Sequence, residues 1–296
     1  MRKRMINSKV LAVLVGIFFL SFGKCLALAP EFEQKIYGLK WICYSPTNYN
    51  PETNLFPSPQ SLEDDLVLLI KAGFNGLITY GSQSILGDIP QIAKRVGFEG
   101  VIMGVWDIRD AGEMENAIGA AKYVDGYCLG NEGMFKRYEL EELKFAIDNV
   151  KEKTGKPATT TEEITDYAKD TVMNVGDWIF PNVHPYFFNV KDPGQAVRWT
   201  EKYYLVIGRS AERVGKLVFF KEVGLPTAGD QLAGSANQQR FFELLEKTNI
   251  KFAYFEAYDQ PWKDFKPVEP HWGLFDRNRH PKRYISGKLK TSIDEN

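Results

Sequence analysis

Short apolar runs alternate with amphipathic stretches along most of this 296-residue chain. The apolar runs predict eight buried strands, at residues 40–44, 77–80, 101–105, 126–129, 156–161, 178–180, 217–221 and 251–256. Apolar residues at helical spacing lie between them, in residues 61–71, 89–96, 111–123, 140–153, 167–172, 195–213 and 237–248. Eight alternations of strand and helix predict an α/β fold, a single-domain (β/α)₈ TIM barrel over residues 30–296.

A doubly wound open sheet is the structural alternative to the barrel. Such a sheet usually has a Gly-rich phosphate-binding turn after its first strand. Here that position holds Tyr44-Ser45-Pro46-Thr47, which cannot cradle a pyrophosphate, and no nucleotide-binding motif occurs elsewhere. The barrel is therefore favoured, and no nucleotide is expected as a ligand.

The N-terminal residues 1–29 have the pattern of a signal peptide. A basic start is followed by an apolar run over residues 10–22 and by small residues around Ala27, where cleavage is favoured because Pro30 follows Ala29. The apolar run is short for a membrane span. We therefore expect a secreted, periplasmic or cell-surface protein. Lipid attachment at Cys25 is less favoured, because Lys24 stands where a small residue is usual.

Charge and composition exclude several classes of partner and cofactor. Without residues 1–29, Lys and Arg fall from 37 to 32 against 38 Asp and Glu, a net charge of −6, which argues against a nucleic-acid partner. Cys43 and Cys128 lie in apolar runs and are expected to be buried thiols rather than a disulfide. The three His are scattered, so we expect neither a metal nor another cofactor.

Two glutamates follow predicted strands at positions that suggest catalysis. Glu132 follows the fourth strand and Glu222 ends the seventh, and the carboxyl ends of all barrel strands meet at one face. Cleavage of a glycosidic bond needs one carboxyl group as acid and a second as nucleophile or base. We predict Glu132 as acid/base and Glu222 as nucleophile. A helix-start carboxylate and a solvent-facing strand end are the structural alternatives, and Glu162 is the second candidate for the acid.

Polar and aromatic residues at the same face are candidates for binding a sugar. Asn131 can hydrogen-bond a 2-hydroxyl group, and the rings of Trp262 and Trp272 can stack on flat sugar faces, although loop packing would also explain them. The other predicted strand ends supply Tyr44, Tyr80, Glu162, His184, Tyr186 and Glu256, and the loop after the last strand supplies Lys263.

Four motifs in order resemble glycoside hydrolase family seventeen, the β-1,3-glucanase family. They are Gly130-Asn131-Glu132, residues 182–187 (NVHPYF), residues 221–226 (KEVGLP) and residues 269–276 (EPHWGLFD). The resemblance covers residues 38–284 and implies a retaining barrel enzyme without cofactor or metal, with Glu132 as acid/base and Glu222 as nucleophile. It also implies Lys263 and Glu269 as supporting residues and Tyr44 and Tyr80 in the sugar pocket. Gln260 departs from the family, since many members have Glu there.

The sequence therefore predicts a retaining hydrolase of β-1,3-glucan that is monomeric. A β-1,3-glucan transglycosylase is the first alternative, because a sugar hydroxyl can replace water in the second step. A non-catalytic glucan-binding barrel is the alternative from another class. Exo or endo action depends on loop shape and is not predicted.

Overall fold

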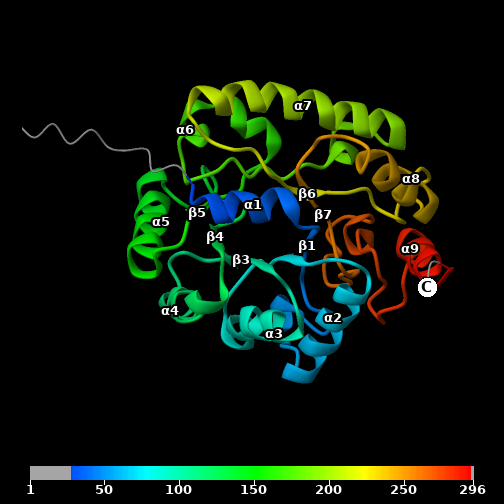
Figure 1. Ribbon diagram of the computed structural model, residues 1–296, viewed down its shortest axis with the longest axis horizontal. Helices are drawn as coiled ribbons and strands as arrows, with labels where there is room; N and C mark the ends of the chain where they lie inside the picture. The colour runs from blue at the N-terminus through cyan, green and yellow to red at the C-terminus, as the bar shows by residue number, and fades with distance from the viewer. Residues whose placement is uncertain (1–27, 295–296) are drawn as a thin grey trace, which may run out of the picture.

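The computed structural model describes residues 28–294 and contains a curled parallel sheet surrounded by helices (Figure 1). The predicted signal peptide lies outside the described residues except for Leu28 and Ala29. Seven strands pair in the order β5-β4-β3-β2-β1-β7-β6, so the first and last strands of the chain are neighbours. They are β1 (Trp41–Cys43), β2 (Gly76–Ile78), β3 (Gly100–Val105), β4 (Gly126–Leu129), β5 (Ala158–Thr159), β6 (Phe220–Val223) and β7 (Phe252–Tyr254).

The closed eight-stranded barrel that the sequence predicts is not confirmed, because residues 178–180 form no strand. Backbone hydrogen bonds still join this stretch to both edge strands of the sheet. Asp177 donates to Ala158 of β5, and Ile179 forms a parallel bridge with the chain just before β6. Pro181 lacks an N–H group, so a regular ladder cannot continue through it.

The helices lie around the outside of the sheet, except for one that the sequence did not predict. Figure 1 shows α1 crossing the middle of the ring of strands. None of the helices in residues 28–294 is long and apolar enough to cross a bilayer. The helices are α1 (Pro30–Gly38), α2 (Pro59–Lys71), α3 (Ile89–Val96), α4 (Ala111–Gly119), α5 (Leu140–Thr154), α6 (Asp170–Met173), α7 (Pro193–Arg213), α8 (Ser235–Leu245) and α9 (Arg283–Asp294).

Helix starts follow from the local sequence. The sequence suggests that α2 begins at Ser61, but it begins two residues earlier, at Pro59. Ser58 accepts a hydrogen bond from the Ser61 amide, and proline suits the first turn because its missing N–H has no partner there in any helix. Asp110 and Asp192 cap α4 and α7 in the same way.

An apolar cluster fills the inside of the curled sheet, and we call it the inner cluster. It contains Phe32 of α1, whose ring lies 5.0 Å from that of Trp178, together with Trp41 at the start of β1. Both cysteines, Cys43 and Cys128, belong to it and are free and buried, as predicted. Phe32 and Trp41 place part of the inner cluster at the amino ends of the strands, while Phe255 and Trp272 extend it to the carboxyl ends.

Glycine at the start of β2 makes room for a buried indole. A Cβ atom on Gly76 would lie 2.4 Å from the Trp41 ring. We expect Gly76→Ala to lower the free energy of unfolding by about 1–3 kcal/mol, because the indole has no space to move into. Gly208→Ala is the control, since nothing lies within 4 Å of a Cβ atom there and the residue is inside α7. It should stabilise by about 0.5–1 kcal/mol. Equal melting temperatures for the two variants would contradict this account.

Candidate active site

A cleft of about 1040 Å³ lies at the carboxyl ends of the strands. Both predicted catalytic carboxylates line it, which brings together residues that are 90 positions apart in the sequence. Most of the other predicted site residues line it too, namely Tyr44, Tyr80, Asn131, His184, Trp262, Lys263, Glu269 and Trp272. Four others, Glu162, Tyr186, Glu256 and Gln260, are not among its lining residues.

Glu222 is buried between two basic groups. Its Oε1 lies 2.8 Å from the Lys221 ammonium and its Oε2 lies 3.1 Å from His184 Nε2. Burial alone would raise the pKa of this carboxyl. The charge of Lys221 and the hydrogen bond from His184 outweigh burial and lower the pKa to about 2. Glu222 is therefore ionised throughout the physiological range, as a carboxylate nucleophile must be.

A β-bulge in β6 turns Lys221 and Glu222 to the same side. Phe220 pairs with Phe252 and Glu222 pairs with Ala253, so two steps along β6 match one step along β7. Adjacent side chains of a regular strand point to opposite faces, and the extra residue cancels that alternation here. The ammonium and the carboxylate can therefore meet.

Glu132 is held in a left-handed backbone conformation, with φ of 51°. This region is unfavourable for a residue with a side chain, and it persists only where neighbouring groups fix it. The Glu132 amide donates to the Thr161 carbonyl at 2.8 Å, and Asn182 Nδ2 donates to Glu132 Oε1 at 2.9 Å. Both backbone and side chain of the predicted acid are thus fixed at the cleft.

A chain of hydrogen bonds connects the two carboxylates. From Glu132 it passes to Asn182, whose Nδ2 also lies 3.4 Å from Asn131 Oδ1. Lys221 Nζ donates to that same Asn131 oxygen at 2.6 Å and to Glu222 at 2.8 Å. The two carboxylates therefore belong to one preorganised polar network, and of the two only Glu222 is in direct contact with the Lys221 ammonium.

Comparison with known proteins now identifies the family. The model of the BtgE/BtgC glycoside hydrolase domain matches residues 42–273. The chain belongs to the BtgE/BtgC glycoside hydrolase family. The finer resemblance to family seventeen is not confirmed by this match.

One curated relative and two solved structures are similar to the chain. A protein of Aspergillus oryzae named probable glucan endo-1,3-beta-glucosidase btgC is 25% identical over 197 residues, which is 53% of this chain and 28% of that protein. The chain thus matches well under half of that relative. An endo-laminarinase from Formosa Hel1_33_131 superposes with a TM-score of 0.72 at 16% identity, over 86% of this chain and 87% of that one.

A third comparison is with a protein from Rhizomucor miehei. Its structure is described as an active-site mutant of a β-1,3-glucanosyltransferase in complex with laminaritriose. The TM-score is 0.69 and the identity 22%, over 83% of this chain and 96% of that one. At these identities both structural matches show a shared fold.

Glu162 of this BtgE/BtgC domain lies beneath the loop that carries Glu132. It is almost fully buried, and its Oε1 accepts a hydrogen bond from the Met134 amide at 3.0 Å. Its Oε2, like the hydroxyls of Thr160 and Tyr167, has no hydrogen-bond partner among the described residues. Burial raises the pKa of Glu162 to about 7. Glu162 therefore lies where it can hold the loop in place. It was predicted to contact the sugar, but it is not among the residues that line the cleft.

The raised pKa of Glu162 predicts how stability changes with pH. Ionising this carboxyl is harder in the folded than in the unfolded protein, so stability is lost as the pH rises through about 7. Glu162→Gln removes that loss and keeps an acceptor for Met134. The free energy of unfolding of the variant should exceed that of wild type by about 3 kcal/mol at pH 9, since the pKa is raised from 4.5 to about 7 and each pKa unit is worth about 1.4 kcal/mol. Near pH 4 the two should be similar.

Chemical denaturation at several pH values measures this difference. Glu163→Gln is the matched control, because Glu163 is the next residue and forms an exposed ion pair with Lys136 at 2.9 Å. Exposed pairs contribute little, so this variant should follow wild type at every pH. A Glu162→Gln variant with the wild-type pH profile would show that Glu162 does not titrate as proposed.

Two predicted residues from the loop after β7 support that loop from below. Gln260 is buried, donates to the Ser45 carbonyl at 3.0 Å and accepts from Trp262 Nε1 at 2.8 Å. Glu256 is fully buried, and both its oxygens contact the Lys263 ammonium, at 3.0 and 2.9 Å. Burial raises the pKa of Glu256 to about 7 although Lys263 opposes the shift. These residues hold Trp262 and Lys263, which do line the cleft.

Tyrosine hydroxyls that the sequence places at the site mostly bind protein groups. Tyr44 donates to Asp65 at 2.9 Å, and Tyr186 donates to Asp230 at 3.0 Å. The Tyr80 hydroxyl is buried without a partner among the described residues, and its ring lies 4.5 Å from the Lys221 ammonium. Trp272 is fully buried against His184, with ring centres 5.1 Å apart, so it cannot offer an open face to a sugar.

Two exposed rings on the rim, Trp106 and Phe265, were not predicted at the active face. Trp106, directly after β3, is 47% exposed and carries the Arg137 guanidinium 4.7 Å from its ring. Phe187 and Phe265 are 42% and 66% exposed, and all three rings line the cleft. The position of Trp106 at the end of a predicted strand was the available signal. Asn182 and Lys221, which join the two carboxylates, were likewise seen only as parts of motifs.

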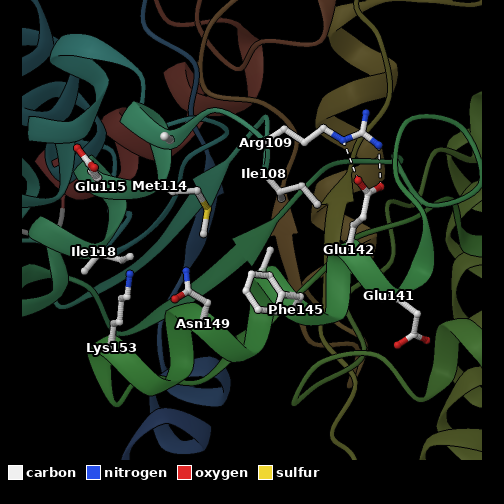
Figure 2. Close-up of a pocket in the computed structure, with 12 residues that line it drawn as sticks. Ile108, Arg109, Met114, Glu115, Ile118, Glu141, Glu142, Phe145, Asn149 and Lys153 are labelled. Atoms are coloured by element: carbon white, nitrogen blue, oxygen red, sulfur yellow. Dashed lines mark hydrogen bonds and ion pairs between the residues drawn. The ribbon is translucent and has the colours of Figure 1, made fainter.

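A second hollow of about 630 Å³ lies on the outer surface between α4 and α5 (Figure 2). Phe145 projects into it, and Arg109 forms an ion pair with Glu142 at 2.6 Å along one side. None of the predicted site residues lines this hollow. Both predicted catalytic carboxylates thus line the cleft at the strand ends and not this outer hollow.

Proposed function

We propose that this chain is a retaining glycoside hydrolase acting on β-1,3-glucan, with Glu222 as nucleophile and Glu132 as acid/base. One observation carries the proposal. Two carboxyl groups line one cleft in a single hydrogen-bond network, and only Glu222 has an ammonium against it. Two carboxyl groups in different environments are what a double displacement needs.

In the first step Glu222 attacks the anomeric carbon, and the bond from that carbon to the leaving oxygen breaks. Glu132 gives its proton to the leaving oxygen, so the aglycone departs as an alcohol. The sugar is then an ester of Glu222. His184 and Lys221 hold the attacking carboxylate in place before this step, and Asn131 stands beside it for the 2-hydroxyl group.

In the second step a water molecule attacks the same carbon while Glu132 takes its proton. The ester bond breaks, and its electron pair returns to the carboxylate of Glu222. Two inversions give net retention of configuration at the anomeric carbon.

β-1,3-Glucan is the substrate class that the relatives' names favour. The btgC relative is named a glucan endo-1,3-beta-glucosidase, and the Rhizomucor protein is described in complex with laminaritriose. Exposed rings from two parts of the rim, Trp106 and Phe265, suit a substrate several sugar units long. We also retain glycoside hydrolase family seventeen as the finer assignment, on the four motifs in the sequence, and propose that residues 177–183 complete a barrel.

Transfer to a second sugar is the other candidate activity. An exposed ring beside the cleft can hold an acceptor whose hydroxyl replaces water, and the Rhizomucor protein is a glucanosyltransferase. A non-catalytic glucan-binding domain is less favoured. Binding alone has no need of a buried ammonium against a buried carboxylate, because burying charges is unfavourable.

Products from laminaripentaose test the proposal. Proton NMR of the first product should show the β-anomer before mutarotation, and an α-anomer would exclude a double displacement. Products longer than the substrate would favour transfer, and shorter products alone would favour hydrolysis. Binding without new products would support the non-catalytic alternative. Export directed by the signal peptide in residues 1–29, with cleavage after Ala27, and a monomeric state also remain proposals.

A further inference from the structure

Lys221 has no role in the steps above beyond holding Glu222, yet it is one of the most buried charged groups in the described chain. It is 1% exposed and does not line the cleft, so it does not touch a substrate there. Burying an ammonium is strongly unfavourable unless its partners compensate. Its partners therefore show what the charge is for.

Among the described residues, the Lys221 ammonium donates to two side chains and lies over one ring, and these three groups belong to the site. It donates to Glu222 Oε1 at 2.8 Å and to Asn131 Oδ1 at 2.6 Å, and it lies 4.5 Å from the centre of the Tyr80 ring. Asn131 and the ring are neutral, and Glu222 is the single carboxylate of residues 28–294 within salt-bridge distance of Lys221. Among its charged neighbours, the Lys221 ammonium therefore acts most strongly on the nucleophile.

The bulge in β6 is needed for this contact. Phe219 belongs to the inner cluster, while Phe220 and Val223 pack in the outer core between sheet and helices. Lys221 and Glu222 stand between Phe220 and Val223 in the sequence, and both side chains point to the inside of the curled sheet. The extra residue in β6 makes this possible. The irregularity in β6 therefore lies at the position where it brings the Lys221 ammonium to Glu222.

We propose that Lys221 acts through Glu222 to speed the second step, the release of the sugar from its ester, relative to the first. This inference rests on the proposed double displacement. Lys221 is a positioning residue in this role, because it touches Glu222 and Asn131 rather than the sugar.

The reason is the change of charge on Glu222 during the cycle. In the first step the carboxylate loses its negative charge as the bond to the anomeric carbon forms, so an ammonium at 2.8 Å opposes attack. In the second step that bond breaks, water supplies the new oxygen and the electron pair returns to the carboxylate. The same ammonium then stabilises the developing charge. A carboxylate with a lowered pKa is a weaker nucleophile and a better leaving group.

Lys221→Met removes the charge and keeps an unbranched side chain. The probe is 2,4-dinitrophenyl β-laminaribioside, whose leaving group makes kcat report the second step while kcat/KM reports the first. We expect kcat to fall at least about tenfold, or about 1.4 kcal/mol in the barrier, with KM falling as well. Intact-protein mass spectrometry should show a larger fraction of enzyme carrying one laminaribiosyl unit. The acid limb of the kcat/KM profile should move to higher pH.

Lys40→Met is the matched control. Lys40 also pairs with a carboxylate, Glu246 at 3.2 Å, and lies over a ring, Tyr254 at 4.8 Å, but it stands at the amino end of β1, away from the cleft. It should change stability without changing KM or the labelled fraction. Lys221→Arg keeps the charge and should restore part of kcat. If Lys221→Met does not fold, Lys221→Gln gives the same comparison.

The outcomes separate this inference from the proposed function. If kcat falls in Lys221→Met with KM and the labelled fraction unchanged, Lys221 is only structural and the inference is overturned. If Glu222→Gln turns over laminaripentaose like wild type, the proposed function itself fails. Accumulation of the labelled enzyme in Lys221→Met but not in Lys40→Met supports the role of Lys221.

Discussion

Glu222→Gln is expected to abolish turnover of laminaripentaose, with kcat/KM lowered on the order of 10⁴-fold or more. The amide keeps the shape of the side chain and one acceptor oxygen for the Lys221 ammonium, but it cannot form the ester with the anomeric carbon. Reducing-end release and product chromatography measure the loss. Turnover within tenfold of wild type would contradict the assignment of Glu222 as nucleophile.

The same substitution tests the electrostatics of the site. The pKa of Glu222 is lowered to about 2 in the fold, so its ionised form stabilises the protein above about pH 4, the ordinary value for Glu. That stabilisation is lost as the pH falls toward 2. Wild type should therefore lose more stability than Glu222→Gln between these pH values. Glu212→Gln, on the exposed side of α7, is the control and should match wild type in stability and activity.

Glu132→Gln is expected to lower kcat/KM for laminaripentaose by about 10²- to 10⁴-fold, because the amide cannot protonate the leaving oxygen. An aryl glycoside with an acidic phenol as leaving group needs no such proton, so the loss on kcat/KM should be much smaller there. The ratio between the two substrates is the measurement that identifies an acid.

Azide and a distant carboxylate supply the controls for Glu132. In Glu132→Ala, added azide should raise kcat on the aryl glycoside by attacking the ester of Glu222, and the product should be the β-glycosyl azide. Glu152→Gln, exposed on α5, should leave the substrate ratio as in wild type. Equal losses on both substrates in Glu132→Gln would indicate a binding or structural role in place of the acid.

The strand pattern and the two carboxylates could be predicted because each depends on local sequence. Apolar runs mark β1 to β4 closely, and a Glu after such a run falls at the carboxyl edge of any parallel sheet. The sixth predicted strand is wrong because apolar residues alone do not form a ladder. Pro181 follows them directly and removes a donor. The first helix, residues 30–38, was missed because no predicted strand precedes it. It follows the predicted signal peptide directly and so lies outside the alternation of strands and helices.

The orientation of side chains around the site could not be predicted. Gln260 stands next to the other loop residues in sequence, but its hydrogen bond with Ser45 draws it beneath the loop. Trp272 was expected to stack on sugar and is fully buried, because His184 and its neighbours cover its ring. Such outcomes depend on contacts between segments far apart in the chain. Trp106 is exposed for the same reason, since Arg137 from the next loop holds its ring.

The bulge in β6 has a consequence for insertions and deletions. The partnership of Lys221 and Glu222 depends on β6 having one residue more than β7 between two paired positions. Inserting one residue into the matching part of β7 would restore regular pairing, and the adjacent side chains of Lys221 and Glu222 would then point to opposite faces of the sheet. A chain with every residue type of the site intact would thus lose this arrangement through a change in length alone. Alignments of related chains should therefore be judged at this strand by gap position as well as by residue identity.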